Sequence, residues 1–147
     1  MRSLLNQSDR QEIISRIRAL TSDHRAQWGV MDVSQMLVHC QKPLELAMRD
    51  PKPPRTLMGR IIGPMAKKEV FGERPFKKNG YTPPQFRVTG PQEFKPNRDK
   101  LIALIERFPT EMPKVSLVHP FFGPMPLEQW GEGCYKHLDY HLGQFGA

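Results

Sequence analysis

Two histidines near the C-terminus have a spacing that allows both to bind one ion. His137 and His141 are four residues apart, in a stretch whose apolar periodicity predicts a helix. Side chains at that spacing share a helix face, with Cβ atoms about 5–6 Å apart, so both imidazoles can reach one cation at about 2.0–2.1 Å. Catalytic metal sites usually add a third protein ligand and keep a position open for water. The pair therefore indicates a metal site completed from another helix.

His39 is the strongest candidate for the third ligand. It lies in MLVHC, beside an apolar stripe typical of a buried helix face. Unpaired buried imidazoles are costly, and shared coordination would satisfy three of them at once. His24 lies in a polar segment that we expect to be exposed, and His119 lies in a loop where it could cover the site or cap a turn. Histidines that simply pack or form hydrogen bonds would produce the same spacing, and this alternative stays open.

Two further side chains are candidates for the pocket or for the outer shell of the site. Gln144 follows His141 by three residues and could orient it or a bound molecule, although a surface position on the last turn fits equally well. Cys134 shares the apolar stripe with His137, but buried cysteines more often act as small hydrophobic residues, which we favour. His119 is the third, weaker candidate of this kind.

The sequence assigns no catalytic residue. Asp139 lies between the two C-terminal histidines but on a different helix face, and Glu45 is more than one turn beyond His39. Neither carboxylate is therefore placed well enough to be named as a general base.

Helices must position these side chains, because hydrophobic periodicity predicts helices and no convincing strand. The four long helices are expected over residues 8–20, 32–50, 92 or 96–108, and 126–145. A shorter helix is expected over 56–70, where two glycines and a proline weaken the pattern. Ser8 with Gln11, and Asp32 with Gln35, match the capping box that starts a helix, and Pro109 is expected to end the third long helix.

These helices predict an all-α protein with one domain over residues 1–147. Four amphipathic helices in a chain of this length favour a four-helix bundle. About forty residues separate the second long helix from the third, which suits a long crossover connection and argues against a plain up-down-up-down order.

Composition and charge indicate where the protein is located and which classes of partner it could bind. No apolar run approaches the roughly 18 residues that span a bilayer, and the N-terminus lacks a secretory apolar region, so we expect a cytoplasmic protein without a membrane partner. Between Lys52 and Lys78 there are eight basic and two acidic residues, a net charge of +6. Such a segment can attract anions, but it can also be a solvated loop. Nucleic acid is not favoured, because no nucleic-acid-binding motif accompanies the charge.

Three segments resemble those of the DinB-like family of small helical metalloproteins. WGVMDVSQMLVHC at 28–40 and HLDYHLGQFG at 137–146 are similar to its two signatures, and HPFFGPMPLEQW at 119–130 resembles an uncharacterised branch. The resemblance implies an up-down-down-up four-helix bundle with a divalent metal held by His39, His137 and His141. It also implies relatives that are transferases and isomerases using low-molecular-weight thiols.

The chemistry expected of such a site is metal-dependent catalysis on a small molecule. An ion held by three neutral histidines keeps its full charge and can acidify a bound water or thiol, so hydrolysis and thiol transfer both stay open. Zinc or nickel is the expected ion, and a low-molecular-weight thiol is an optional cofactor. The alternative is a non-catalytic metal-binding or interaction protein that uses the basic segment 52–78. A homodimer is compatible with either.

Overall fold

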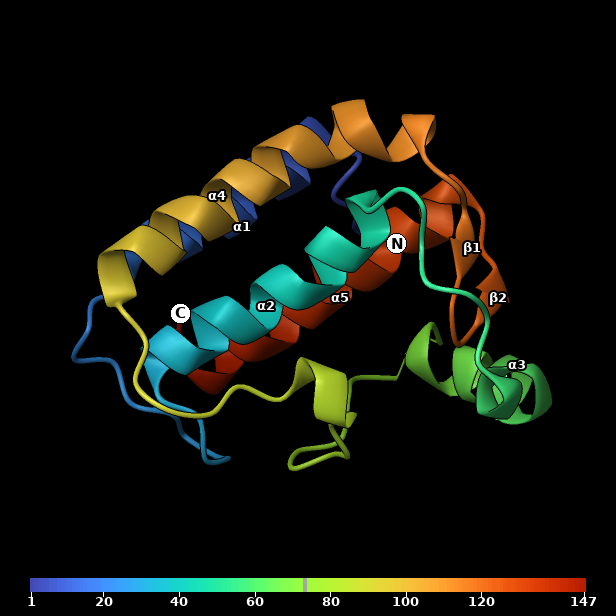
Figure 1. The fold of residues 1–147 in the computed structure, drawn as a ribbon. Coiled ribbons are helices and arrows are strands. Elements are labelled where there is room, and N and C mark those ends of the chain that lie inside the picture. Colours follow the sequence, from blue (N-terminus) through green and yellow to red (C-terminus); the bar gives the residue numbers. More distant parts are fainter. Residues whose placement is uncertain (73) are drawn as a thin grey trace.

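The computed structural model describes residues 1–72 and 74–147, and this part of the chain is predominantly α-helical (Figure 1). Its elements are α1 (Gln7–Ala19), α2 (Val33–Met48), α3 (Leu57–Val70), α4 (Phe94–Glu111), α5 (Leu127–Gln144), β1 (Val118–His119) and β2 (Gly123–Pro124). Two short 3-10 helices cover Pro84–Phe86 and Met112–Lys114. The expectation of a helical fold is therefore confirmed, with a small antiparallel strand pair added.

The four long helices surround the hydrophobic core. α2 packs against both α4 and α5, and α1 contacts the same two helices. In Figure 1, α4 runs beside α1, and α2 runs beside α5. Each helix contributes fully or nearly fully buried side chains: Ile13, Leu37, Ile105 and Leu138 are examples from α1, α2, α4 and α5. This core fixes α2 next to α5, and these are the two helices that carry the candidate ligands.

The connection from α2 to α4 is long, as expected, and it contains a fifth helix. α3 lies within it and contacts β2, at the end of the molecule away from the chain segment that enters α4 (Figure 1). The connection then returns through the 3-10 helix at Pro84–Phe86, which contacts α2. A description with four helices alone is therefore too simple for this chain.

The start of α2 follows the sequence prediction, whereas the start of α1 does not. Asp32 accepts a hydrogen bond from the backbone N–H of Gln35 at 2.8 Å, and the Gln35 side chain accepts one from the Asp32 N–H at 3.0 Å. The predicted box at Ser8 is wrong, because the N-cap is Asn6, two residues earlier, and Ser8 lies inside α1. The carboxylate of Asp9 instead accepts from the Ser3 N–H at 2.9 Å, which ties the N-terminal residues to the first turn.

Two further expectations are corrected. α4 continues through Pro109 to Glu111. Proline removes one helical hydrogen bond, but Phe108 and Met112 on either side are both fully buried, and their packing offsets that loss. The expectation of no strand missed β1 and β2, in which Val118 pairs with Pro124. Strands of two residues are too short to produce an alternating pattern in the sequence.

Several expectations about the chain as a whole stay predictions, namely the single domain over 1–147, the cytoplasmic location and the absence of nucleic-acid partners. In the described part of the chain, no helix has the length and apolar character needed to cross a membrane. Glu73, one of the two acids counted in the basic segment 52–78, lies outside the described residues.

Truncation of Phe108 should destabilise the fold strongly. Its side chain is fully buried between the helices, so Phe108→Ala removes packing and leaves a cavity, at a cost of about 3–5 kcal/mol in the free energy of unfolding. Urea unfolding followed by circular dichroism measures this. Glu106→Ala, at an exposed position of the same helix, is the matched control and should stay within about 0.5 kcal/mol of the wild type. Equal effects of the two variants would contradict the packing of α4 described above.

Candidate metal centre

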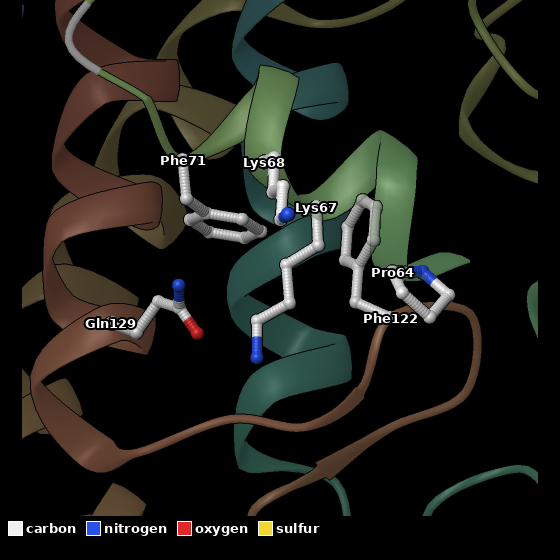
Figure 2. Close-up of a pocket in the computed structure, with 6 residues that line it drawn as sticks. All are labelled: Pro64, Lys67, Lys68, Phe71, Phe122 and Gln129. Carbon is white, nitrogen blue, oxygen red and sulfur yellow. The ribbon is translucent and has the colours of Figure 1, made fainter. Parts of the chain in front are cut away.

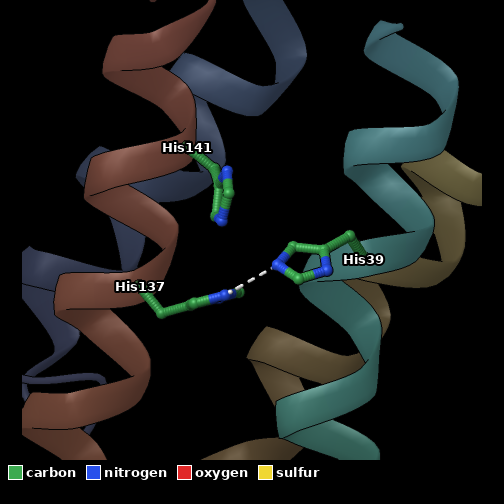
Figure 3. Close-up of side chains that lie close together, drawn as sticks. All are labelled: His39, His137 and His141. Carbon is green, nitrogen blue, oxygen red and sulfur yellow. Dashed lines mark hydrogen bonds between the residues drawn. The ribbon is translucent and has the colours of Figure 1, made fainter. Parts of the chain in front are cut away.

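Three histidines from two helices converge on one point between α2 and α5. His39 projects from α2, and His137 and His141 project from successive turns of α5 (Figure 3). One ring nitrogen of each lies within 4.8 Å of the others. The Nε2 atoms of His39 and His137 are only 3.1 Å apart. The structure thus brings together the three side chains that the sequence selected.

The packing of α5 against its neighbours fixes where His137 and His141 point. Leu138 and Leu142, each next to one of the histidines in the sequence, are 1% exposed and belong to the core. On the α1 side, Arg16 donates to the carboxylate of Asp139 at 2.7 Å and to the backbone carbonyl of Ala147 at 2.8 Å. Because these contacts hold the helix on two sides, the histidine face is turned toward α2.

The backbone of the 3-10 helix at Pro84–Phe86 determines the tautomer of His39. The Nδ1 atom of His39 lies 2.8 Å from the carbonyl oxygen of Phe86. A carbonyl oxygen only accepts hydrogen bonds, so Nδ1 carries the proton. In the neutral ring, Nε2 therefore keeps its lone pair, and this atom faces His137. The ring of His39 is thus oriented with its Nε2 lone pair toward the other two histidines.

A chain of hydrogen bonds orients His141 in the same way. Its Nδ1 lies 2.8 Å from Oε1 of Gln144, and the Gln144 Nε2 donates to the carbonyl oxygen of Trp28 at 2.6 Å. Because the carbonyl of Trp28 must receive an N–H, the amide of Gln144 can only present its oxygen to His141. His141 therefore carries its proton on Nδ1 and keeps the Nε2 lone pair. Outer hydrogen bonds of this kind raise ligand basicity and fix ring orientation in metal sites.

Gly29 leaves room for that chain. Its φ of +87° is unfavourable for other residues, and a Cβ added there would lie 2.6 Å from the Gln144 side-chain nitrogen. A side chain at position 29 would therefore collide with the amide that holds His141. The glycine in the WG pair at 28–29 is explained by this close approach.

All three imidazoles are held in the neutral form that binds metals. Burial lowers the pKa of His39 below its usual value, with a further contribution from Lys42, and lowers that of His141 to about 4. Burial, followed by the proximity of the other two rings, lowers the pKa of His137 well below 6.5. His39 and His141 are only 5% and 8% exposed. Three neutral rings can supply three lone pairs at physiological pH.

The spacing of the donors fits a transition-metal ion. Nitrogens bound tetrahedrally at about 2.0–2.1 Å are about 3.4 Å apart, close to the 3.1 Å between His39 and His137. The third donor lies within 4.8 Å of the others, so it would have to approach by up to about 1.4 Å to reach that spacing. Imidazole donors suit zinc, nickel, copper and iron alike, so the ligand set supports a metal ion without selecting one.

The remaining candidates lie elsewhere or play other parts. His24 accepts from the backbone N–H of Thr21 at 3.0 Å, and it is partly buried rather than exposed as expected. His119 caps a turn by accepting from the Phe121 and Phe122 N–H groups, and its ring packs against Trp130. Of its two expected roles, the turn cap is the one observed.

Cys134 lies in the core rather than among the ligands. It is a free, buried thiol, and burial raises its pKa to about 12, which disfavours the metal-binding thiolate. The two carboxylates considered as general bases are also engaged elsewhere. Asp139 binds Arg16, and Glu45 lies 2.6 Å from the ammonium group of Lys100. Within the described residues, the group that could hold a metal ion consists of the three histidines.

Sequence reasoning missed the aromatic contacts beside the centre. The ring of Tyr140 lies 5.0 Å from that of His141, and its hydroxyl accepts from the Trp28 indole N–H at 3.1 Å and donates to the Lys77 carbonyl at 3.2 Å. The ring of Phe76 packs edge-on against Tyr140. These contacts join the loop after α3 to the histidine face of α5. Tyr140 lies between the two histidines in the sequence and could have indicated an aromatic contact at the site. Its partners could not be predicted, because Trp28 and Phe76 are distant in the sequence.

The metal-free chain should lose stability as the pH falls from about 6.5 toward 4. The folded-state pKa of His141 is about 4, below the unfolded value of 6.5, so the unfolded chain binds more protons in this window. The free energy of unfolding therefore rises with pH here, by on the order of 3 kcal/mol from this residue. Urea unfolding in chelator between pH 5 and 7.5 measures the slope. His141→Asn should make the slope smaller but not zero, because burial also lowers the pKa of His39 and His137, and an unchanged slope would contradict the buried neutral ring.

Comparison with known proteins corrects the resemblance suggested by the sequence. No curated protein and no solved structure matches the chain. The DinB-like assignment is wrong: one family model matches residues 1–147, and it is not that of the DinB-like family. The segments 28–40 and 137–146 do not identify the family, because two histidines one turn apart and a third on a facing helix would occur in any helical site with three histidines. The chain belongs to the family described as "Protein of unknown function (DUF1569)", which covers it from residue 1 to residue 147.

Proposed function

We propose that this protein binds one divalent metal ion through His39, His137 and His141 and uses it in a reaction on a small molecule. The observation that carries the proposal is the convergence of three ring nitrogens, from two helices, within 4.8 Å of one another. The Nδ1 atoms of His39 and His141 already have partners, and a shared ion would also satisfy the nitrogens that face the centre. Metal that binds only the folded chain would also stabilise it.

The number of protein ligands favours catalysis over a purely structural role. Structural zinc sites usually have four protein ligands, whereas catalytic sites have three and keep a position for water or substrate. In residues 1–72 and 74–147 the group contains three histidines and no carboxylate or thiolate. A bound divalent ion would supply Lewis acidity and lower the pKa of a coordinated water toward about 7. We therefore propose hydrolysis as the reaction class and zinc or nickel as the ion.

The protein's own contribution is to hold the donors neutral and aligned. The Phe86 carbonyl and the Gln144 amide keep the protons of His39 and His141 on Nδ1. The long helices provide the rigid framework, and the four-helix bundle expected from the sequence is our proposal for their arrangement, supported by the contacts of α1 and α2 with α4 and α5. Thiol transfer and a thiol cofactor lose their main support, because they rested on the corrected resemblance.

A non-catalytic interaction role is the second candidate, and a specific observation favours it. α3 exposes a row of large apolar side chains within the basic segment 52–78. This feature is remote from the histidines in the sequence and would serve binding rather than chemistry. An interaction surface on α3 is compatible with the metal centre, because the two involve different residues.

Metal binding should be stoichiometric and should depend on the α5 pair. Isothermal titration of the chelator-treated chain with Zn²⁺ and Ni²⁺ should give one site per chain. His137→Ala removes a donor and should weaken binding by about a hundredfold or more. His24→Ala, which lies outside the cluster, is the matched control and should bind like the wild type. Chelator-sensitive hydrolysis of an activated ester, lost in His137→Ala, tests catalysis. Equal affinities for the two variants would contradict the assignment.

Gln144 should act on metal affinity through His141. Gln144→Ala removes the acceptor from the His141 Nδ1–H and should lower metal affinity by about 10–100-fold. Gln144→Glu keeps an acceptor at that position and should retain more of the affinity than the alanine variant. Competition with a chelating dye measures both. If the two variants bind metal equally weakly while both stay folded, Gln144 supports the helix end rather than the ligand.

A further inference from the structure

α3 turns its small residues inward and its large apolar residues outward. Gly59 and Gly63 are buried, and a Cβ added at either would collide with the backbone carbonyl of Phe121. The helix therefore approaches the loop between β1 and β2 through glycine backbone. An ordinary surface helix does the opposite, because its large apolar side chains form the contact with the core.

Large apolar residues form a row on the outward face of α3, where Arg60, Lys68 and Glu69 are the exposed charged positions. Leu57, Ile61 and Met65 are 75%, 73% and 73% exposed, and Met58 and Ile62 extend the same face. These positions recur at the spacing of one helix side, so they form one contiguous stripe. We call these five residues the α3 apolar face. A row of this size on the outside of a soluble fold marks an interaction site.

Basic side chains border the α3 apolar face. Arg60 and Lys68 are exposed on α3, and Lys67 extends from the same helix to the Pro124 carbonyl at 2.7 Å. Lys67 and Lys68 also line an open groove of about 450 Å³, together with Phe71 and Phe122 (Figure 2). The whole segment 52–78 carries a net charge of +6. The surface that receives this face should therefore be anionic.

We propose that α3 docks the protein on an anionic lipid bilayer, lying in the plane of the membrane surface. Interfacial helices combine one apolar face with flanking lysine and arginine, and they need no spanning segment. Anionic lipids attract each basic residue near the surface, and the apolar face enters the boundary between headgroups and acyl chains. α3 lies at one end of the molecule, outside the four long helices, where a flat surface can reach it (Figure 1).

Charge disfavours a second copy of the chain as the occupant. In a two-fold dimer the same patch faces itself, so two segments of net charge +6 would be brought together. The proposal departs from the expectation of no membrane partner, which rested on the lack of a spanning run. It does not depend on the metal centre.

Vesicle sedimentation with the full chain tests the proposal. The protein should bind vesicles made of phosphatidylcholine and phosphatidylglycerol in equal parts, with weaker binding at high salt and on pure phosphatidylcholine. Ile61→Ser combined with Met65→Ser should reduce the affinity by about tenfold or more. Arg60→Gln combined with Lys68→Gln should also weaken binding and reduce its salt dependence. Val30→Ser, at an exposed apolar position outside α3, is the matched control and should bind like the wild type.

Three outcomes would overturn the proposal. The first is no binding of the wild type to the anionic vesicles. The second is equal binding by the wild type and by the variant with serine at positions 61 and 65, with both folded by circular dichroism. The third is a concentration-dependent dimer in analytical ultracentrifugation that the serine variant loses, because this would assign the α3 apolar face to a second copy. Loss of metal binding in His137→Ala should leave vesicle binding unchanged.

Discussion

The packing of α2 against α5 is the constraint on which the candidate centre depends. It places an imidazole from the middle of one helix opposite two from the C-terminal half of another, with His39 and His141 buried and His137 partly buried. Desolvation then keeps the rings neutral, and fixed hydrogen bonds on the outer nitrogens of His39 and His141 leave their inner nitrogens free to donate. The ligand set therefore follows from helix packing, and two backbone carbonyls from the connecting segments fix the orientation of the rings.

The connecting segments supply the hydrogen-bond acceptors that orient the histidine rings. Phe86 lies in the connection between α3 and α4, and Trp28 lies in the segment between α1 and α2, yet their carbonyls set the proton positions of histidines on the helices. Tyr140 links the same two connections by accepting from the Trp28 indole and donating to Lys77. A conformational change in either connection would thus reach the centre through specific hydrogen bonds.

The sequence predicted the long helices and the three histidines well, because both follow from periodicity. The apolar stripe that contains His137 and His141 repeats at helical spacing. The capping residues before α2 mark where that helix begins, and the apolar positions that follow place His39 beside its buried face. Backbone acceptors such as the Phe86 carbonyl could not be predicted, since every residue has one and only the tertiary fold selects it. The orientation of α3 could not be predicted either, because its outward direction follows from tertiary contacts: Gly59 and Gly63 pack against Phe121, and the large apolar side chains are exposed. The family resemblance was wrong because a short histidine pattern can indicate a type of site without indicating common ancestry.

X-ray absorption spectroscopy of the metal-loaded protein would identify the atoms bound to the ion. We expect about three histidine nitrogens at about 2.0–2.1 Å, with the remaining position filled by oxygen and no sulfur scattering near 2.3 Å. A sulfur shell would place Cys134 or Cys40 on the ion, and a spectrum without the multiple scattering of imidazole would remove the histidines from it. Either result would contradict the account.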